Sequence, residues 1–294
     1  MFDGGVDRFL GGSAVFSFWW AQRFTWGVCL LVASLAAPVL GHDLWLVPGR
    51  FRMTPGESIR IFINNGDQFP ESLTLLGKQR VRRLEWASID GKVRVVETAV
   101  DGKSLSFDLQ APSSGHAVLS LETEPRTIRL TAEDFRSYLE SEQQESLIDR
   151  IASAEEARGA LIERYQKYAK ALLLGRMPVA REDDLWRRAV GHRLEIVPES
   201  MPGEFVSGER LRFKVLFGGE PIAGVRLVAG RSDEQPFELG TTSIDGTVGM
   251  SLEHPGRWFV RAFIIQPMPD ESLDADYESF WATLTFEIGP RPLE

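Results

Sequence analysis

The feature that most constrains the fold of this chain is a series of short alternating segments separated by turn residues. Between residues 42 and 130 these segments are HDLWLVP, SIRIFIN, RRLEWASI, KVRVVETAV, SLSFDL and HAVLSLET. Alternation of apolar and polar residues is typical of strands that bury one face. Asp90-Gly91 and Asp101-Gly102 suit hairpin tips because glycine tolerates the positive φ of such turns. Residues 42–130 are therefore predicted to form a first β-sandwich domain.

A second set of strand-like segments lies in the C-terminal part of the chain, within residues 181–294. It consists of HRLEIVPES, RLRFKVLFGG, AGVRLVAGR, FELGTTS, TVGMSLE, GRWFVRAFII and SFWATLTFEIG. Gly218-Gly219, Asp245-Gly246 and Pro255-Gly256 provide turns between them. The pattern predicts a second β-sandwich, of the immunoglobulin-like or transthyretin-like kind.

The segment between these two sets, residues 131–180, has a different pattern. Thr131 and Asp134 resemble a capping box at the start of a helix. Apolar residues then follow at mostly helical spacing: Phe135, Leu139, Leu147, Ile148, Ile151, Ala154, Leu161, Tyr165, Tyr168 and Leu172. One short and one long helix are predicted, with a break near residues 141–146. The predicted fold is mainly β, with a helical insertion or linker between two sandwiches.

The N-terminus has the order of a secretory signal peptide. Arg8 and Arg23 precede an uncharged apolar run over residues 24–40, which ends in small residues. Residues 1–41 are predicted to be the signal peptide, with cleavage after Gly41 favoured over cleavage after Ala36. Cleavage would remove both Cys29 and the apolar run. The mature chain would then have no cysteine for a disulfide and no stable membrane span. The protein is predicted to be periplasmic or secreted; the alternative is a permanent single-pass anchor.

Composition and motifs limit the classes of function. The chain has 33 Lys and Arg against 42 Asp and Glu, a formal net charge of -9, without a basic stripe. Nucleic acid is therefore excluded as an expected partner. The sequence lacks a Gly-x-Ser-x-Gly elbow, a His-Glu-x-x-His motif and a phosphate loop, so an enzyme is not the first expectation.

His42 is the leading candidate for a functional residue. After cleavage behind Gly41, His42 would offer an α-amine and a ring nitrogen to a single ion, and imidazole suits nickel, copper and zinc. His192 is the preferred second ligand and His116 another candidate. Asp43 could bind through oxygen or orient the ring. The alternative is that His42 only starts a strand, because no compact group of histidines is visible.

Several motifs together carry a family resemblance. They are HDLWL at 42–46, ERYQKYAK at 163–170, VGHRLEIVP at 190–198, VLFGGEPIAG at 215–224 and YESFWATLTFE at 277–287. The chain resembles a secreted bacterial family of unknown function that is often labelled nickel-uptake substrate-specific component, or NikM-like. The resemblance implies a periplasmic or surface β protein linked to metal handling.

Three hypotheses of function follow. The first is a metal-binding accessory protein in the uptake or delivery of nickel, cobalt or copper, with an envelope transport component as partner. The second is a non-enzymatic envelope module that binds protein or glycan. The third is a copper-dependent enzyme that uses an N-terminal histidine.

Overall fold

The computed structural model describes residues 41–148, 160–175, 184–200, 205–269 and 274–291. The predicted signal peptide, with its apolar run and Cys29, lies outside the described residues except for Gly41. Within the described part of the chain, no helix combines the length and the apolar character needed to cross a membrane.

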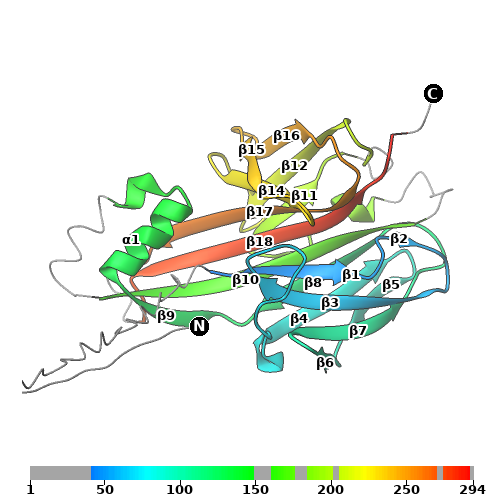
Figure 1. Cartoon of the computed structure of the whole chain (residues 1–294), viewed down its shortest axis with the longest axis horizontal. Helices are drawn as coiled ribbons and strands as arrows, with labels where there is room; N and C mark the ends of the chain where they lie inside the picture. The colour runs from blue at the N-terminus through cyan, green and yellow to red at the C-terminus, as the bar shows by residue number, and fades with distance from the viewer. Residues whose placement is uncertain (1–40, 149–159, 176–183, 201–204, 270–273, 292–294) are drawn as a thin grey trace, which may run out of the picture. The chain divides into compact units, whose positions relative to one another are not determined.

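The described residues form three sheets, which confirms the predicted mainly β, sandwich-like fold (Figure 1). The first sheet has the strand order β1 (Asp43–Pro48), β3 (Ser58–Gly66), β7 (Ser104–Gln110) and β6 (Ala99–Asp101). A second sheet has the order β11 (Leu194–Pro198), β12 (Arg210–Phe217) and β13 (Glu220–Pro221), with β16 (Thr247–Ser251) also paired to β12.

The third sheet is the largest and contains strands from both predicted sandwiches. Its order is β15 (Phe237–Thr241), β14 (Arg226–Arg231), β17 (Gly256–Pro267), β18 (Tyr277–Ile288), β10 (Ala160–Gly175), β8 (Ala117–Thr123), β4 (Val81–Ser88) and β5 (Gly91–Arg94). Two further strands, β2 (Arg52–Met53) and β9 (Arg126–Thr131), also pair with β10. The predicted strand over residues 92–100 is interrupted and falls into β5 and β6.

Helical structure is short in the described residues. It comprises the helix α1 (Ala132–Ser141), residues 145–148, and two 3-10 turns, η1 (Lys78–Arg80) and η2 (Leu185–Arg187). The start of α1 is as predicted, because the Thr131 side chain accepts a hydrogen bond from the Asp134 backbone N–H. Phe135, Tyr138 and Leu139 of α1 pack against β9, β10, β17 and β18 (Figure 1).

The prediction of a long helix is wrong for residues 160–175, which form the 16-residue strand β10. This segment is rich in Ala, Leu, Lys and Glu, which favour helices. Its surroundings override that preference: β10 pairs in parallel with β18 and antiparallel with β8 and β9. The part of the predicted helix over residues 149–159 lies outside the described residues.

Strand β10 is buried on both of its faces. Ala169, Ala171 and Leu173 pack into the core beneath the first sheet. Tyr168, Leu172 and Leu174 pack into the core shared with β11 and β12. Since side chains alternate across a strand, these two sets lie on opposite faces of the largest sheet. The two sandwiches therefore share that sheet, which carries the first sheet on one face and the second sheet on the other.

Because both faces of β10 are buried, two consecutive leucines on it are predicted to contribute similarly to the stability of the fold. Leu172→Ala and Leu173→Ala should each lower the free energy of unfolding by about 2–5 kcal/mol, because each leaves a cavity in a different core. Chemical denaturation measures the effect. Ile244→Ala, at a side chain that is 92% exposed, is the control and should change stability by less than about 0.5 kcal/mol. A small effect at either leucine would contradict the arrangement.

Candidate functional site: a cation-lined pocket beside His42

A pocket of about 360 Å³ opens beside His42, on the face of the largest sheet that carries the first sheet and α1. Its charged and hydrogen-bonding side chains include Arg80, Arg126, Glu163 and Lys167. Its volume is within the range that holds small molecules in proteins.

Strand register brings the pocket residues together. Glu163, Tyr165 and Lys167 alternate along β10 and therefore point to one face. In the neighbouring strand β9, Arg126 lies opposite Tyr165. In β18, Trp281 lies opposite Lys167. Residues that are far apart in the sequence thus line one cavity because their strands pair in this register.

Lys167 is held by neutral oxygen atoms in the structure. Its Nζ donates to the backbone carbonyl of His42 and to Asn65 Oδ1, the latter at 3.2 Å. Burial lowers the pKa of Lys167 to about 8, with Asp43 opposing the shift and Arg80 adding to it. Lys167 therefore fixes the backbone at His42 while its ammonium group stays close to the pocket.

Arg80 is the second cation, at the C-terminal end of η1. Its guanidinium carbon lies 5.3 Å from the centroid of the Tyr165 ring, and Lys167 Nζ lies 5.8 Å from the same centroid. Arg80 Nε and Nη1 are shielded from solvent, and neither has a hydrogen-bond partner in the described residues. Such unpaired donors are costly to bury unless an acceptor joins them.

Glu163 is the acidic member of the pocket lining and is bound to hydroxyl groups. It accepts hydrogen bonds from Ser279 and, at 3.2 Å, from the Tyr138 hydroxyl. Burial raises the pKa of Glu163, and the two hydroxyl donors oppose that shift. This carboxylate is thus occupied by neutral donors and does not pair directly with Arg80.

His42 lies at the rim of the pocket and contacts an aspartate. Its Nδ1 is 2.5 Å from Asp67 Oδ1, and the His42 side chain is 29% exposed. Asp67 follows β3, whose Asn65 and Asn64 pair with Leu44 and Trp45 of β1. No pattern in the sequence indicates that Asp67 contacts His42, because the contact depends on the pairing of β1 with β3.

Asp43 belongs to a different ionic group. Its Oδ1 lies 3.6 Å from Arg261 Nη1, and Arg261 also pairs with Glu142 at 3.0 Å. Burial raises the pKa of Asp43 to about 6, although Arg261 lowers it. Arg261 in turn stacks over Trp281, a pocket residue, at 5.1 Å from the ring centroid. Asp43 is therefore linked to the pocket wall indirectly, through Arg261 and Trp281.

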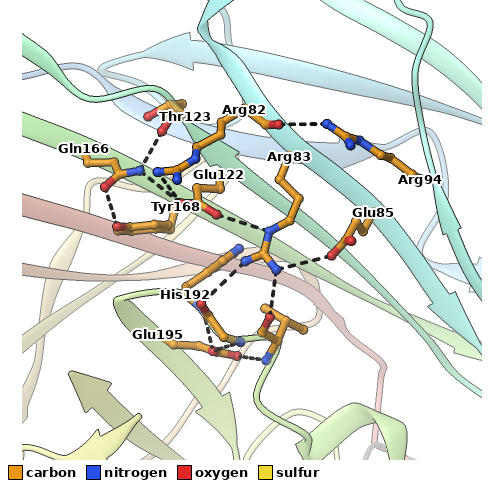
Figure 2. Close-up of polar contacts among 12 residues, drawn as sticks. Arg82, Arg83, Glu85, Arg94, Glu122, Thr123, Gln166, Tyr168, His192 and Glu195 are labelled. Carbon is orange, nitrogen blue, oxygen red and sulfur yellow. Dashed lines mark hydrogen bonds and ion pairs between the residues drawn. The ribbon is translucent and has the colours of Figure 1, made fainter. Parts of the chain in front are cut away.

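His192 lies on the opposite face of β10, within the polar network shown in Figure 2. Its ring stacks on Tyr168 with 5.0 Å between centroids, and both ring nitrogens lack hydrogen-bond partners in the described residues. Burial and the neighbouring Lys170 and Arg83 hold the pKa of His192 well below its ordinary value. This neutral ring packs in the core between the two sheets.

Glu195 organises the segment that carries His192. Its carboxylate accepts from the backbone N–H groups of Val190, Gly191 and His192 at 2.7, 3.0 and 3.2 Å (Figure 2). It also accepts from Lys170 Nζ at 2.7 Å, and both side chains are almost fully buried. This ion pair joins β10 to β11.

His116 lies near the end of β10. Its Nδ1 accepts a hydrogen bond from the Gly175 backbone N–H at 3.3 Å. Gly175 is eight residues along the strand from Lys167, which is about 26 Å at the usual strand rise. His42, next to Lys167, is therefore distant from His116.

Four residues were predicted to bind a metal. The side chains of the other three do not contact the ring of His42. His192 packs on Tyr168 on the other face of β10, His116 contacts Gly175 at the end of β10, and Asp43 pairs with Arg261. The described residues contain no group of three or more His, Cys, Asp or Glu side chains placed to hold an ion. The nearest ligand-type side chain to His42 is Asp67, which was not among the predicted ligands.

The sequence interpretation missed Arg80, Arg126, Tyr165 and Lys167 as pocket residues. The Glu-x-Tyr-x-Lys alternation at 163–167 is a signal with the period of a strand, but the segment was interpreted as a helix. Six aromatic side chains in or near the strands are buried: Trp45, Trp86, Trp186, Trp258, Phe280 and Trp281.

Comparison with known proteins identifies a family. Residues 39–266 match the family described as Domain of unknown function (DUF4198), and the chain belongs to that family. No curated protein matches the chain significantly.

Several solved structures share a distant likeness. A marsupial T cell receptor has 9% identity and a TM-score of 0.21, over 86% of this chain and 75% of that one. Trypsin-activated alpha-2-macroglobulin from Escherichia coli has 11% identity and a TM-score of 0.21, over 84% and 24%. Three N-terminal domains of the bacteriophage RB49 Hoc protein have 8% identity and a TM-score of 0.18, over 83% and 59%.

The Glu195 network predicts a large loss of stability on truncation. Glu195→Ala should lower the free energy of unfolding by about 3–5 kcal/mol, because Lys170 would be left as a buried unpaired charge. Thermal or urea unfolding measures it. Glu199→Ala, which removes the partly exposed partner of Arg212 and Lys214, is the matched control and should cost less than about 1 kcal/mol. Equal losses would contradict the role of Glu195.

The raised pKa of Asp43 predicts a pH-dependent stability. Between its ordinary pKa of 3.8 and about 6, the folded protein retains a proton that the unfolded chain has lost. The contribution of Asp43 to the free energy of unfolding therefore falls as pH rises through this window. Asp43→Asn removes that contribution, so urea unfolding at a series of pH values should show a smaller fall than in the wild type. An unchanged pH profile would contradict the assignment.

Proposed function

We propose that this protein is an extracytoplasmic, non-enzymatic binding protein that takes up a transition-metal ion at His42 for metal uptake or delivery. Nickel, cobalt and copper are the metals proposed, with an envelope transport component as the partner. The secreted or periplasmic location rests on the predicted signal peptide, and the resemblance to proteins labelled NikM-like favours metal handling.

The observation that carries the proposal is the contact between His42 Nδ1 and Asp67 Oδ1 at 2.5 Å on a partly exposed rim. Imidazole nitrogen and carboxylate oxygen are two ligand types of transition metals. Cleavage after Gly41 would add the α-amine of His42 as a third. The hydrogen bond from Lys167 to the His42 carbonyl would hold this new terminus in place.

The charge of the pocket limits where the ion would bind. Arg80, Arg126 and Lys167 repel a divalent cation from the interior of the cavity. Asp67 lies at the rim and supplies the negative charge beside His42. We therefore place the metal on the His42–Asp67 side of the rim, with water or a partner protein completing its coordination.

The test combines processing with metal titration. The exported full chain is analysed by intact mass and N-terminal sequencing and is then titrated with nickel, cobalt, copper and zinc ions. We expect a chain that starts at His42 and binds a single ion, with binding abolished by His42→Ala and weakened by Asp67→Asn or by an extra residue before His42. His254→Ala, at an exposed turn, is the matched control and should bind normally.

Two results would contradict the proposal. A chain that starts at Ala37 would have no α-amine at His42. A chain that starts at His42 and binds none of the four ions would show that the rim is not a metal site.

A second candidate function is favoured by an exposed apolar edge. β5 is the last strand of the largest sheet in the described residues, and Val93 in it and Val96 after it are 57% and 81% exposed; Val100, in the end strand β6 of the first sheet, is 56% exposed. Exposed apolar side chains at a strand edge suit the docking of another envelope protein. Val93→Lys should abolish such docking, measured by co-purification from the periplasm, without changing metal binding.

A further inference from the structure

The pocket beside His42 has more positive than negative charge in its lining. Arg80, Arg126 and Lys167 line it together with a single carboxylate, Glu163. Glu163 is occupied by the hydroxyl groups of Ser279 and Tyr138. Lys167 donates to a carbonyl and an amide oxygen, and the nearby carboxylates of Asp43, Asp67 and Glu163 offset part of its charge. Within the lining itself, however, the cationic side chains outnumber the carboxylate.

Arg80 presents donors that lack an acceptor. Its Nε and Nη1 are shielded from solvent without a hydrogen-bond partner in the described residues. A guanidinium grips the two oxygens of a carboxylate through Nε with Nη2 or through Nη1 with Nη2, so a carboxylate would satisfy one of the two unpaired donors. An anion beside this guanidinium would also offset the repulsion between Arg80 and Lys167, which flank the same Tyr165 ring.

Apolar side chains form a large part of the remaining wall and select among anions. Leu76, Ile128, Leu130 and Trp281 line the cavity beside the cations. An inorganic anion would leave this surface uncovered, whereas an organic acid would cover it with its carbon skeleton. At about 360 Å³ the cavity suits a single small molecule.

We propose that this pocket binds a small organic acid. Its carboxylate is held by Arg80 and Arg126, and its apolar or aromatic body packs against Trp281, Ile128 and Leu130. The site is independent of the metal proposed at the rim, because none of these contacts requires an ion at His42.

Isothermal titration calorimetry of the full chain with benzoate tests the proposal. Benzoate combines a carboxylate with an apolar ring, and benzyl alcohol is the neutral probe of nearly the same shape. The buffer is freed of metals with a chelating resin, so that the result is separate from metal binding. We expect benzoate to bind at millimolar concentration or below, and benzyl alcohol to bind at least about tenfold more weakly.

Variants on two separate elements, η1 and β9, locate the site. Arg80→Met and Arg126→Met should each weaken benzoate binding about tenfold or more, since each removes a charged donor. Arg129→Met is the matched control. Arg129 lies on β9 like Arg126, but it is three residues further along the strand, so its side chain points to the opposite face of the sheet. It should leave binding unchanged. Because Arg126 is exposed, its variant keeps the test valid even if Arg80→Met fails to fold.

Each other outcome would overturn the proposal. Absence of benzoate binding would exclude an organic-acid site, and equal binding of benzyl alcohol would show that charge is not recognised. Binding of inorganic phosphate in place of benzoate would assign the pocket to inorganic anions. An equal loss in Arg126→Met and Arg129→Met would place the bound acid elsewhere. None of these results depends on whether His42 binds metal.

Discussion

The burial of β10 on both faces is the constraint on which the rest of the structure depends. One face closes the core beneath the first sheet, and the other closes the core shared with β11 and β12. A strand in this position must pair along its length, and it does so with β18, β8 and β9. These pairings set the register that places Arg126 and Trp281 beside Tyr165 and Lys167, so the pocket is a direct consequence of how β10 is packed.

Two buried lysines, one on each face of β10, have their charges surrounded by different groups. Lys170 is buried with Glu195 as an ionic partner, and Glu195 also binds three backbone N–H groups. That charge is fully compensated and serves the structure. Lys167, on the other face, donates to neutral oxygen atoms, with the carboxylates of Asp43, Asp67 and Glu163 and the cation of Arg80 nearby. The donors without a partner at the cavity are instead Nε and Nη1 of Arg80.

How far the sequence could predict this structure depended on how each segment is buried. Most strands bury one face and alternate, so segments such as SIRIFIN and RLRFKVLF were predicted correctly. In β10 both faces are buried, and the run from Tyr168 to Leu174 lost its alternation. Its helix-favouring residues then suggested the wrong element. Because the orientation of Glu163, Tyr165 and Lys167 follows from the strand, that error also concealed the pocket.

By itself, the sequence determined the mainly β class and the start of α1. These follow from local patterns, since alternation, capping and turn residues act within a few positions. Only the tertiary structure decided that His42 lies next to Asp67, that His192 packs on the other face of β10, and that Arg80, Arg126 and Lys167 share one cavity. These neighbours are set by strand register and by the face that each side chain occupies, and both depend on pairing between segments that are distant in the sequence.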